Sequence, residues 1–149
     1  MGNIDGVKLK KLKIIKLESG DVLHGINKNE DSFAGFGEAY FSTINYNSIK
    51  GWKKHNKMIL NLVVPIGCVK FVLYDNRELS RTYNNFYEIE ISKSNYFRLT
   101  IPVGVWLAFK GIGKDLNMLL NVSSIPHDPL ETESFPLIND VIPFYDFNK

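Results

Sequence analysis

The sequence predicts an all-β fold, a sandwich or barrel of short strands. Apolar and β-branched runs recur at short intervals, and Gly, Asn, Asp and Ser separate them, which is the rhythm of strands joined by turns. No segment of the chain suits a long helix. At 149 residues, with 44% hydrophobic and 23% charged residues, the chain is long enough to bury one contiguous core. We therefore expect a single domain over residues 1–149.

Nine strands are expected, each an apolar run bounded by turn residues. They cover 8–17, 22–26, 38–45, 58–65, 68–75, 86–92, 96–101, 105–110 and 116–122. Residues 1–20 are expected to form an N-terminal strand or arm.

The last part of the chain, residues 123–149, has a different composition. It contains prolines at four positions: Pro126, Pro129, Pro136 and Pro143. Because proline cannot donate a backbone hydrogen bond, this segment does not suit the interior of a sheet. We expect an irregular tail that packs on the barrel, with a short helix near 129–133.

Two tight turns are expected between apolar runs. Gly67 follows Pro65 and Ile66 and can take a positive φ, which predicts a hairpin between 58–65 and 68–75. The sequence Ile-Pro-Val-Gly-Val-Trp at 101–106 predicts a similar turn.

Charge and cysteine content argue against a nucleic-acid-binding protein and against a disulfide-bonded exported protein. The net charge is +2, and the N-terminal lysines interleave with apolar residues, so a strand with solvated lysines is preferred to a nucleic-acid site. The single cysteine, Cys68, cannot form an intramolecular disulfide, which favours a cytoplasmic location. The sequence shows neither a signal peptide core nor a membrane helix, and we expect no nucleic-acid or membrane partner.

The segment 50–58, Lys-Gly-Trp-Lys-Lys-His-Asn-Lys-Met, contains the preferred candidate for proton transfer. An imidazole titrates near neutrality and can act as base and acid, which singles out His55. Side chains alternate along a strand, and on this basis we expect His55, Lys57 and Asn61 to share one face.

Other side chains have both a functional and a structural interpretation. The lysines of this segment can clamp phosphate or stabilise an enolate oxygen, or form a solvated basic turn; they are Lys50, Lys53, Lys54 and Lys57. Asp75 can orient a histidine or cap a turn. Trp52 and Trp106 can stack on a base or sugar, or belong to the core.

Signatures of several other chemistries are absent from the sequence. It has no phosphate-loop lysine motif, no dinucleotide glycine fingerprint, no nucleophile elbow and no paired-cysteine zinc site. Its three histidines stand alone, whereas a metal site in a small β-barrel uses two or three clustered histidines with a carboxylate. We expect neither a metal nor a cofactor.

Taken in order, several segments resemble the dTDP-4-dehydrorhamnose 3,5-epimerase family. They are Glu-Ala-Tyr-Phe-Ser at 38–42, Lys-Gly-Trp at 50–52 with His55, Gly-Cys-Val-Lys-Phe-Val-Leu-Tyr-Asp-Asn-Arg at 67–77, Ile-Pro-Val-Gly-Val-Trp-Leu-Ala-Phe at 101–109, and Leu-Asn at 120–121 with a downstream Glu131. The resemblance covers roughly residues 36 to 131. It is closest to a short branch associated with capsule and lipopolysaccharide synthesis.

The resemblance implies a cupin, that is, a double-stranded β-helix or jelly roll, which forms a homodimer and needs no metal. It implies action on a nucleotide-linked 4-keto-6-deoxy hexose for surface polysaccharide synthesis. A base would remove a proton next to the keto group, and the enolate would be reprotonated from the opposite face. We expect His55 and Asp75 to be catalytic. The expected substrate-binding residues are Lys50, Lys53, Lys57, Asn61, Arg77, Glu38, Trp106 and Asn121.

The chain departs from the family pattern at three places. His55 is similar to the family's base but sits two residues later after the glycine. The family's Pro-x-Gly-x-x-His reads Pro-Val-Gly-Val-Trp-Leu at 102–107, so Leu107 replaces a histidine. Residues 121–126 contain no tyrosine, although the resemblance leads one to expect a tyrosine proton donor there. A single epimerisation, a ketoisomerisation, and a non-catalytic cupin that binds a sugar nucleotide or a partner enzyme all stay open.

Overall fold

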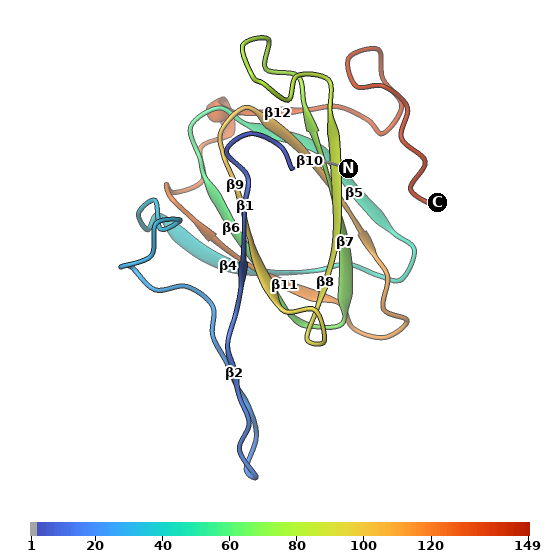
Figure 1. Ribbon diagram of the computed structural model, residues 1–149. Helices are drawn as coiled ribbons and strands as arrows, with labels where there is room; N and C mark the ends of the chain where they lie inside the picture. The colour runs from blue at the N-terminus through green and yellow to red at the C-terminus, as the bar shows by residue number, and fades with distance from the viewer. Residues whose placement is uncertain (1–2) are drawn as a thin grey trace.

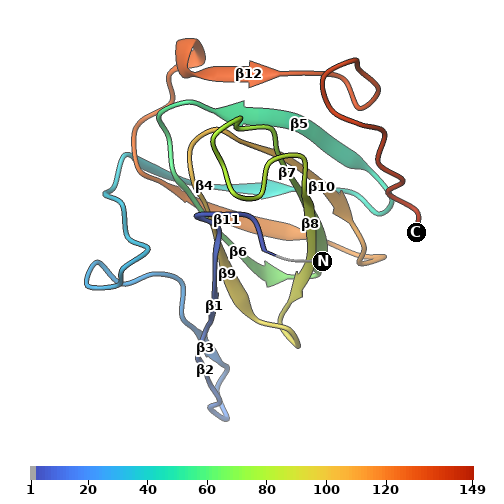
Figure 2. The same cartoon turned by 45° about the horizontal axis from the view of Figure 1, so that its top comes forward.

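Two five-stranded antiparallel sheets face each other in the computed structural model, which describes residues 3–149 (Figure 1 and Figure 2). The first sheet contains, in spatial order, β1 (Lys8–Lys11), β9 (Phe97–Ile101), β6 (Leu60–Ile66), β11 (Met118–Ser123) and β4 (Glu38–Thr43). The second sheet contains β12 (Thr132–Ser134), β5 (Ile49–His55), β10 (Val105–Gly111), β7 (Cys68–Asp75) and β8 (Phe86–Ser92). The predicted all-β jelly roll is confirmed.

The N-terminal part of the chain contributes one strand to the barrel and then forms a hairpin outside it. β1 pairs with β9 at the edge of the first sheet. The chain then forms the hairpin of β2 (Ile14–Ile15) and β3 (Val22–Leu23), which projects from the barrel in Figure 1. The single strand predicted over 8–17 is therefore divided into two short strands. Within residues 3–149, no helix has the length and apolar composition of a membrane span.

The segment that contains His55 is a strand, β5, which the sequence did not predict. Lysine and glycine dominate this segment and have low intrinsic preference for strands. Pairing on both sides overrides that preference, because Lys53 faces Leu107 of β10 on one side and Ser134 of β12 on the other. The basic segment thus lies within a sheet and not in a turn.

The turns at Gly67 and Gly104 occur where the sequence predicts them, with φ values of 79° and 82°. Each turn, however, joins strands of different sheets. β6 pairs with β9 and β11, whereas β7 pairs with β10 and β8, so the predicted antiparallel pairing of 58–65 with 68–75 is wrong. Apolar runs and a turn glycine indicate that the chain reverses, but they do not distinguish a hairpin from a crossing between facing sheets.

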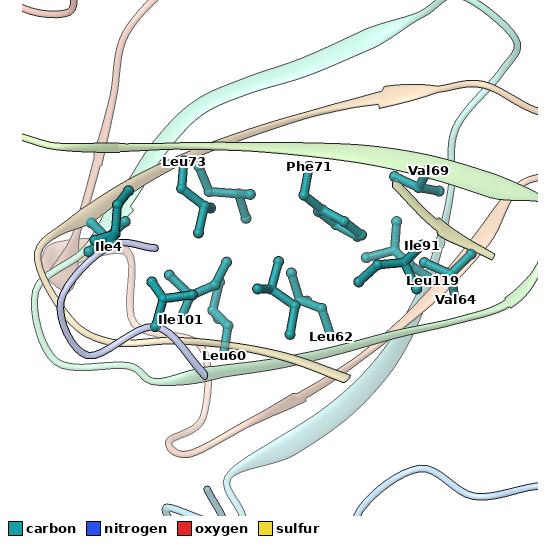
Figure 3. Packing of buried hydrophobic residues seen from close by; sticks show 14 of the residues in the cluster. Ile4, Leu60, Leu62, Val64, Val69, Phe71, Leu73, Ile91, Ile101 and Leu119 are labelled. Atoms are coloured by element: carbon teal, nitrogen blue, oxygen red, sulfur yellow. The ribbon is translucent and has the colours of Figure 1, made fainter. Parts of the chain in front are cut away.

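Apolar side chains from both sheets fill the space between them (Figure 3). Leu60 and Leu62 of β6 lie opposite Phe71 and Leu73 of β7, and all four side chains are buried. Full burial of a Leu or Phe side chain contributes about 1.5–3 kcal/mol relative to exposure. This layer is therefore the main source of stability that holds the two sheets together.

The C-terminal segment forms a second apolar cluster on the outer face of the second sheet. Ile142, Tyr145 and Phe147 from this segment belong to one cluster with Trp52 of β5 and Trp106 of β10. Both tryptophans are only 1% exposed. They are core residues, and the strands of the second sheet are covered on both faces, which explains the nearly continuous apolar run of β7.

Replacing Gly67 by alanine should lower the free energy of unfolding by about 1–3 kcal/mol, because its φ of 79° is unfavourable for a residue with a Cβ. The added Cβ would also lie 2.5 Å from the Leu116 carbonyl oxygen and 2.8 Å from Asn117 Cα. Gly25→Ala is the control, since its Cβ would meet nothing within 4 Å. Urea-induced unfolding measures both variants, and equal stabilities would contradict this role of Gly67.

Candidate active site

A cavity of about 220 Å³ lies between the two sheets. Its apolar lining consists of side chains that also belong to the core or pack against it: Leu60, Leu62, Leu107, Phe109 and Leu119. Its polar side chains are Tyr40, Ser42, Lys50, Lys53, His55 and Asn121. An apolar bed with a few converging polar groups is the usual composition of a small-molecule site.

The polar groups come from two different walls of this cavity. The second sheet provides Lys50, Lys53 and His55, all from β5. The first sheet provides Tyr40 and Ser42 of β4 together with Asn121 of β11. One wall is thus basic, and the facing wall carries only hydroxyl and amide groups.

His55 forms a buried pair with Glu131 at the basic wall. The ring atom Nδ1 contacts Glu131 Oε1, and the two residues are 9% and 2% exposed. An ionised carboxylate accepts hydrogen bonds and cannot donate them, so Nδ1 carries a proton, and in the neutral form of the ring the lone pair is on Nε2. Because His55 lines the cavity, Nε2 is the ring nitrogen available to a ligand.

Local structure fixes the position of Glu131. It ends η1 (Pro129–Glu131), a single turn of 3-10 helix whose first amide, that of Leu130, donates to Asp128 Oδ1 over 2.9 Å. β12 begins at the next residue and pairs with β5 so that Thr132 faces His55. The turn and the strand pairing together deliver the carboxylate to the ring.

The second carboxylate oxygen of Glu131 is bound by the backbone that follows His55. Oε2 accepts hydrogen bonds from the amides of Asn56, Lys57 and Met58, at 3.1, 3.0 and 3.2 Å. Burial raises the pKa of this carboxyl, but the hydrogen bonds from His55 and from the backbone outweigh burial and hold the pKa below its usual value. Glu131 is therefore ionised at neutral pH.

Two lysines give the cavity its positive charge. Lys50 Nζ donates to the Thr43 carbonyl over 2.7 Å and so spans from β5 to β4. The Lys53 side chain makes no hydrogen bond or ion pair with any residue in the described range 3–149, although its backbone lies in the paired strand β5. Its ammonium group is available to an anionic ligand.

Asp75, which we expected to be catalytic, is part of a separate ion-pair network. Its carboxylate accepts from Arg77 Nε at 2.8 Å, from Ser80 Oγ at 2.6 Å and from Thr82 Oγ1 at 2.7 Å. Burial raises the pKa of Asp75, but these hydrogen bonds prevail and hold it well below the usual range. The structure therefore shows the turn-capping arrangement of Asp75, and it is Glu131 that contacts His55.

Arg77 belongs to the same network and not to the cavity. Besides Asp75, its guanidinium donates to the Asp5 carbonyl over 2.6 Å. This contact ties the loop after β7 to the N-terminal segment.

The expectation that Asn61 shares a face with His55 is wrong. The chain turns between the end of β5 and the start of β6, so the alternation does not continue across 56–59. Asn61 lies on the outer face of the first sheet, where it donates to the Ser32 carbonyl over 3.1 Å and accepts from Thr100 Oγ1 over 2.6 Å.

Three further expected substrate-binding residues do not line the cavity. The Lys57 side chain is exposed and its backbone amide binds Glu131. Glu38 begins β4, and its carbonyl accepts from Ser123 Oγ. Trp106 is buried under the C-terminal segment, with its indole N–H donating to Asn76 Oδ1 over 3.1 Å.

Of the expected site residues, the structure brings His55, Lys50, Lys53 and Asn121 together. Sequence reasoning did not assign a role to Tyr40, although strand alternation puts it on the same side of β4 as Glu38. It also assigned none to Glu131, although the Asp-Pro-Leu-Glu sequence that ends with this residue suits a capped turn.

No group of three His, Cys, Asp or Glu side chains is arranged to hold a metal ion within residues 3–149. The cavity contributes a single histidine, and its carboxylate partner is already bound by backbone amides.

Comparisons with known proteins relate this chain to enzymes of sugar nucleotides and polysaccharides. No protein-family model matches it. A solved dTDP sugar isomerase from Desulfovibrio desulfuricans G20 is 36% identical, with a TM-score of 0.91, over 95% of this chain and 91% of that chain. The spore coat polysaccharide biosynthesis protein SpsL of Bacillus subtilis is 29% identical over 126 residues, which are 85% of this chain and 83% of SpsL.

The fold itself is shared with more distant solved structures. A dTDP-4-dehydrorhamnose 3,5-epimerase from Elizabethkingia anophelis superposes with a TM-score of 0.82 at 16% identity, over 100% of this chain and 85% of that chain.

Replacing Glu131 by glutamine should lower the free energy of unfolding at pH 7 by about 1.5–3 kcal/mol, the contribution of a hydrogen bond to a charged group. The folded-state pKa of Glu131 lies below that of the unfolded chain. Its stabilising charge is therefore fully present above the unfolded value of about 4.3 and is lost as the pH falls through the folded value. The difference between wild type and Glu131→Gln should shrink toward pH 3.

Urea unfolding at a series of pH values measures this difference. Glu133→Gln is the control, because Glu133 pairs with Lys54 while about half exposed, and such pairs contribute about 0–1 kcal/mol. A stability gap for Glu131→Gln that does not change with pH would contradict the assignment.

Proposed function

Because this chain belongs to the dTDP-4-dehydrorhamnose 3,5-epimerase family, we propose that it epimerises or isomerises a nucleotide-linked 4-keto-6-deoxy hexose for surface polysaccharide synthesis. The observation that carries the proposal is the buried His55–Glu131 pair, which presents Nε2 to a cavity lined by apolar side chains and a few hydroxyl, amide and ammonium groups. The relatives named for a dTDP sugar isomerase and for polysaccharide biosynthesis support this class of substrate and pathway.

In the proposed reaction, His55 Nε2 removes the proton from a carbon next to the keto group. The ring then becomes an imidazolium, and the ionised Glu131 stabilises that charge through Nδ1–H. The electron pair of the broken C–H bond moves into a C=C bond, and the carbonyl oxygen becomes an enolate oxygen. Since no electrons leave the substrate, the reaction requires no redox cofactor.

The lysines of β5 suit the negative charges of such a substrate. Lys53, the free cation of the cavity among residues 3–149, can stabilise the enolate oxygen. Lys50 lies on the same wall and can bind phosphate. We assign both residues to substrate binding together with Asn121.

His55→Asn should abolish proton exchange on the substrate, because asparagine cannot act as the base. The enzyme is incubated with dTDP-4-keto-6-deoxyglucose in deuterated water, and mass and NMR spectra report deuterium at carbon 3 or 5. General base catalysis contributes about 100- to 10,000-fold, so the label should fall by at least the lower value. His24→Asn serves as the control, since His24 is exposed and does not line the cavity.

A wild-type protein that binds such substrates without any exchange would overturn the enzymatic proposal. That outcome would instead support a non-catalytic cupin that binds a sugar nucleotide or a partner enzyme. Calorimetry with the same nucleotide sugar supplies the binding measurement.

We also propose that the chain forms a homodimer through the outer face of β4, the edge strand of the first sheet. Phe41 on β4 is 63% exposed and lies directly opposite Leu120 of β11. Phe36, just before the strand, is 67% exposed. Exposed aromatic groups next to an unpaired strand edge favour association with another chain.

Phe41→Glu should convert the dimer into a monomer, because burying an unpaired charge opposes association. Sedimentation velocity gives the mass in solution. Leu79→Glu is the matched control, since Leu79 is fully exposed in the loop after β7, and it should leave the dimer intact. A wild type that sediments as a monomer would refute this interface.

Cytoplasmic location is part of the same proposal. Cys68 is a free thiol, and free thiols persist in reducing compartments.

A further inference from the structure

Tyr40 and His55 reach the cavity from facing walls. Tyr40 belongs to β4 of the first sheet, and His55 belongs to β5 of the second. Both side chains line the same cavity. A flat enolate held between the two sheets therefore presents one face to the imidazole and the other face to the phenol.

Asn121 fixes the orientation of the phenol. It lies directly opposite Tyr40 in the β4–β11 ladder, and its Nδ2 donates to Tyr40 Oη over 2.9 Å. Because the phenol oxygen accepts this hydrogen bond, its own O–H is not used by Asn121 and is free for a ligand.

Asn121 has a second feature that indicates a bound molecule. The residue is only 3% exposed, and its Oδ1 has no hydrogen-bond partner within residues 3–149. A buried acceptor without a partner is costly, at about 1–3 kcal/mol. A sugar hydroxyl in the cavity would supply the missing donor next to the phenol.

We propose that Tyr40 delivers the second proton of the reaction and that Asn121 is its positioning residue. This inference rests on the proposed function. After His55 has taken a proton from one face, the enolate electron pair forms a new C–H bond with the proton of Tyr40 on the other face, and the C=O bond is restored. The tyrosinate regains a proton from water, and the imidazolium releases one to water, so that the site returns to its first state.

This geometry also selects the outcome of the reaction. A base and an acid on opposite faces invert the carbon that loses the proton. A ketoisomerisation by one base would instead deliver the proton to the former carbonyl carbon on the face from which it left, while the neighbouring hydroxyl loses its proton and becomes the new C=O. The structure therefore points to epimerisation, with the keto group kept in place.

Other groups of the cavity are less suited to this step. Lys50 and Lys53 lie on the His55 wall, and Lys50 is bound to the Thr43 carbonyl. Ser42 shares the Tyr40 wall, but an aliphatic alcohol is a much weaker acid than a phenol. Tyr40 is the phenol among the residues that line the cavity.

The experiment compares two readouts for Tyr40→Phe with dTDP-4-keto-6-deoxyglucose in deuterated water. Deuterium in recovered, uninverted substrate reports proton removal by His55. Formation of the inverted sugar reports proton delivery from the opposite face. Tyr40→Phe should keep the first within a few-fold of wild type and lose the second by about 100- to 10,000-fold.

Two further variants serve as a control and as a test of the positioning role of Asn121. Tyr46→Phe is the matched control, because Tyr46 is about as exposed as Tyr40, at 47% against 42%, and lies outside the cavity; both readouts should match wild type. Asn121→Ala should lower the ratio of inverted sugar to deuterium uptake, because weaker substrate binding lowers both readouts alike, whereas loss of the contact with Tyr40 lowers inversion alone. The urea midpoint of each variant is measured alongside.

The possible failures are distinct. Normal inversion by Tyr40→Phe would overturn the role of Tyr40 and leave the proposed function intact. Equal loss of uptake and inversion in Tyr40→Phe would assign Tyr40 to substrate binding and also overturn the proposal. A wild type that neither takes up deuterium nor forms product would refute the proposed function and the inference together.

Discussion

The buried carboxylate of Glu131 is the interaction on which the arrangement of the site depends. One oxygen engages the His55 ring, and the other binds the three amides that follow it. The carboxylate thus holds the imidazole and the turn after β5 at the same time. A buried charge is tolerated only when it is fully hydrogen-bonded, and here the same bonds that satisfy the charge also select the tautomer of the histidine.

The barrel provides the rigid frame for this pair. The apolar layer between the sheets forms part of the cavity lining, since Leu60, Leu62 and Leu107 belong to both. On the outer face of the second sheet, the C-terminal segment packs over Trp52, three residues before His55. The same segment contains β12, which pairs with β5 (Figure 2). The composition of β5, which is rich in lysine, does not favour a strand, but the pairing with β12 and the packing over Trp52 hold it in the sheet.

Two departures from the family pattern involve residues that line the cavity, Leu107 and Asn121. The sequence resemblance places Leu107 where the family has a histidine, and in the structure Leu107 belongs to the apolar lining of the cavity. Asn121 begins the segment 121–126 that lacks the expected tyrosine, and its amide contacts a tyrosine on the neighbouring strand. The chain thus has one histidine and one phenol in its cavity, supplied by different sheets.

The composition and apolar runs of the sequence determined the all-β class, most of the strands and the turns at Gly67 and Gly104, because these depend on local propensity and on burial. His55, Lys50 and Lys53 could be singled out because imidazole and ammonium groups have distinctive chemistry wherever they lie. Asp75 illustrates the limit, since a carboxylate at a strand end has the same local signal whether it orients a histidine or pairs with Arg77.

Only the tertiary structure decided that Glu131, 76 positions away in the chain, contacts His55. It also decided that β6 and β7 lie in different sheets and that Asn61 faces outward. Strand pairing and the choice of sheet arise from contacts between distant segments, and no local pattern in the chain encodes them. The facing positions of Tyr40 and His55 follow from that pairing alone.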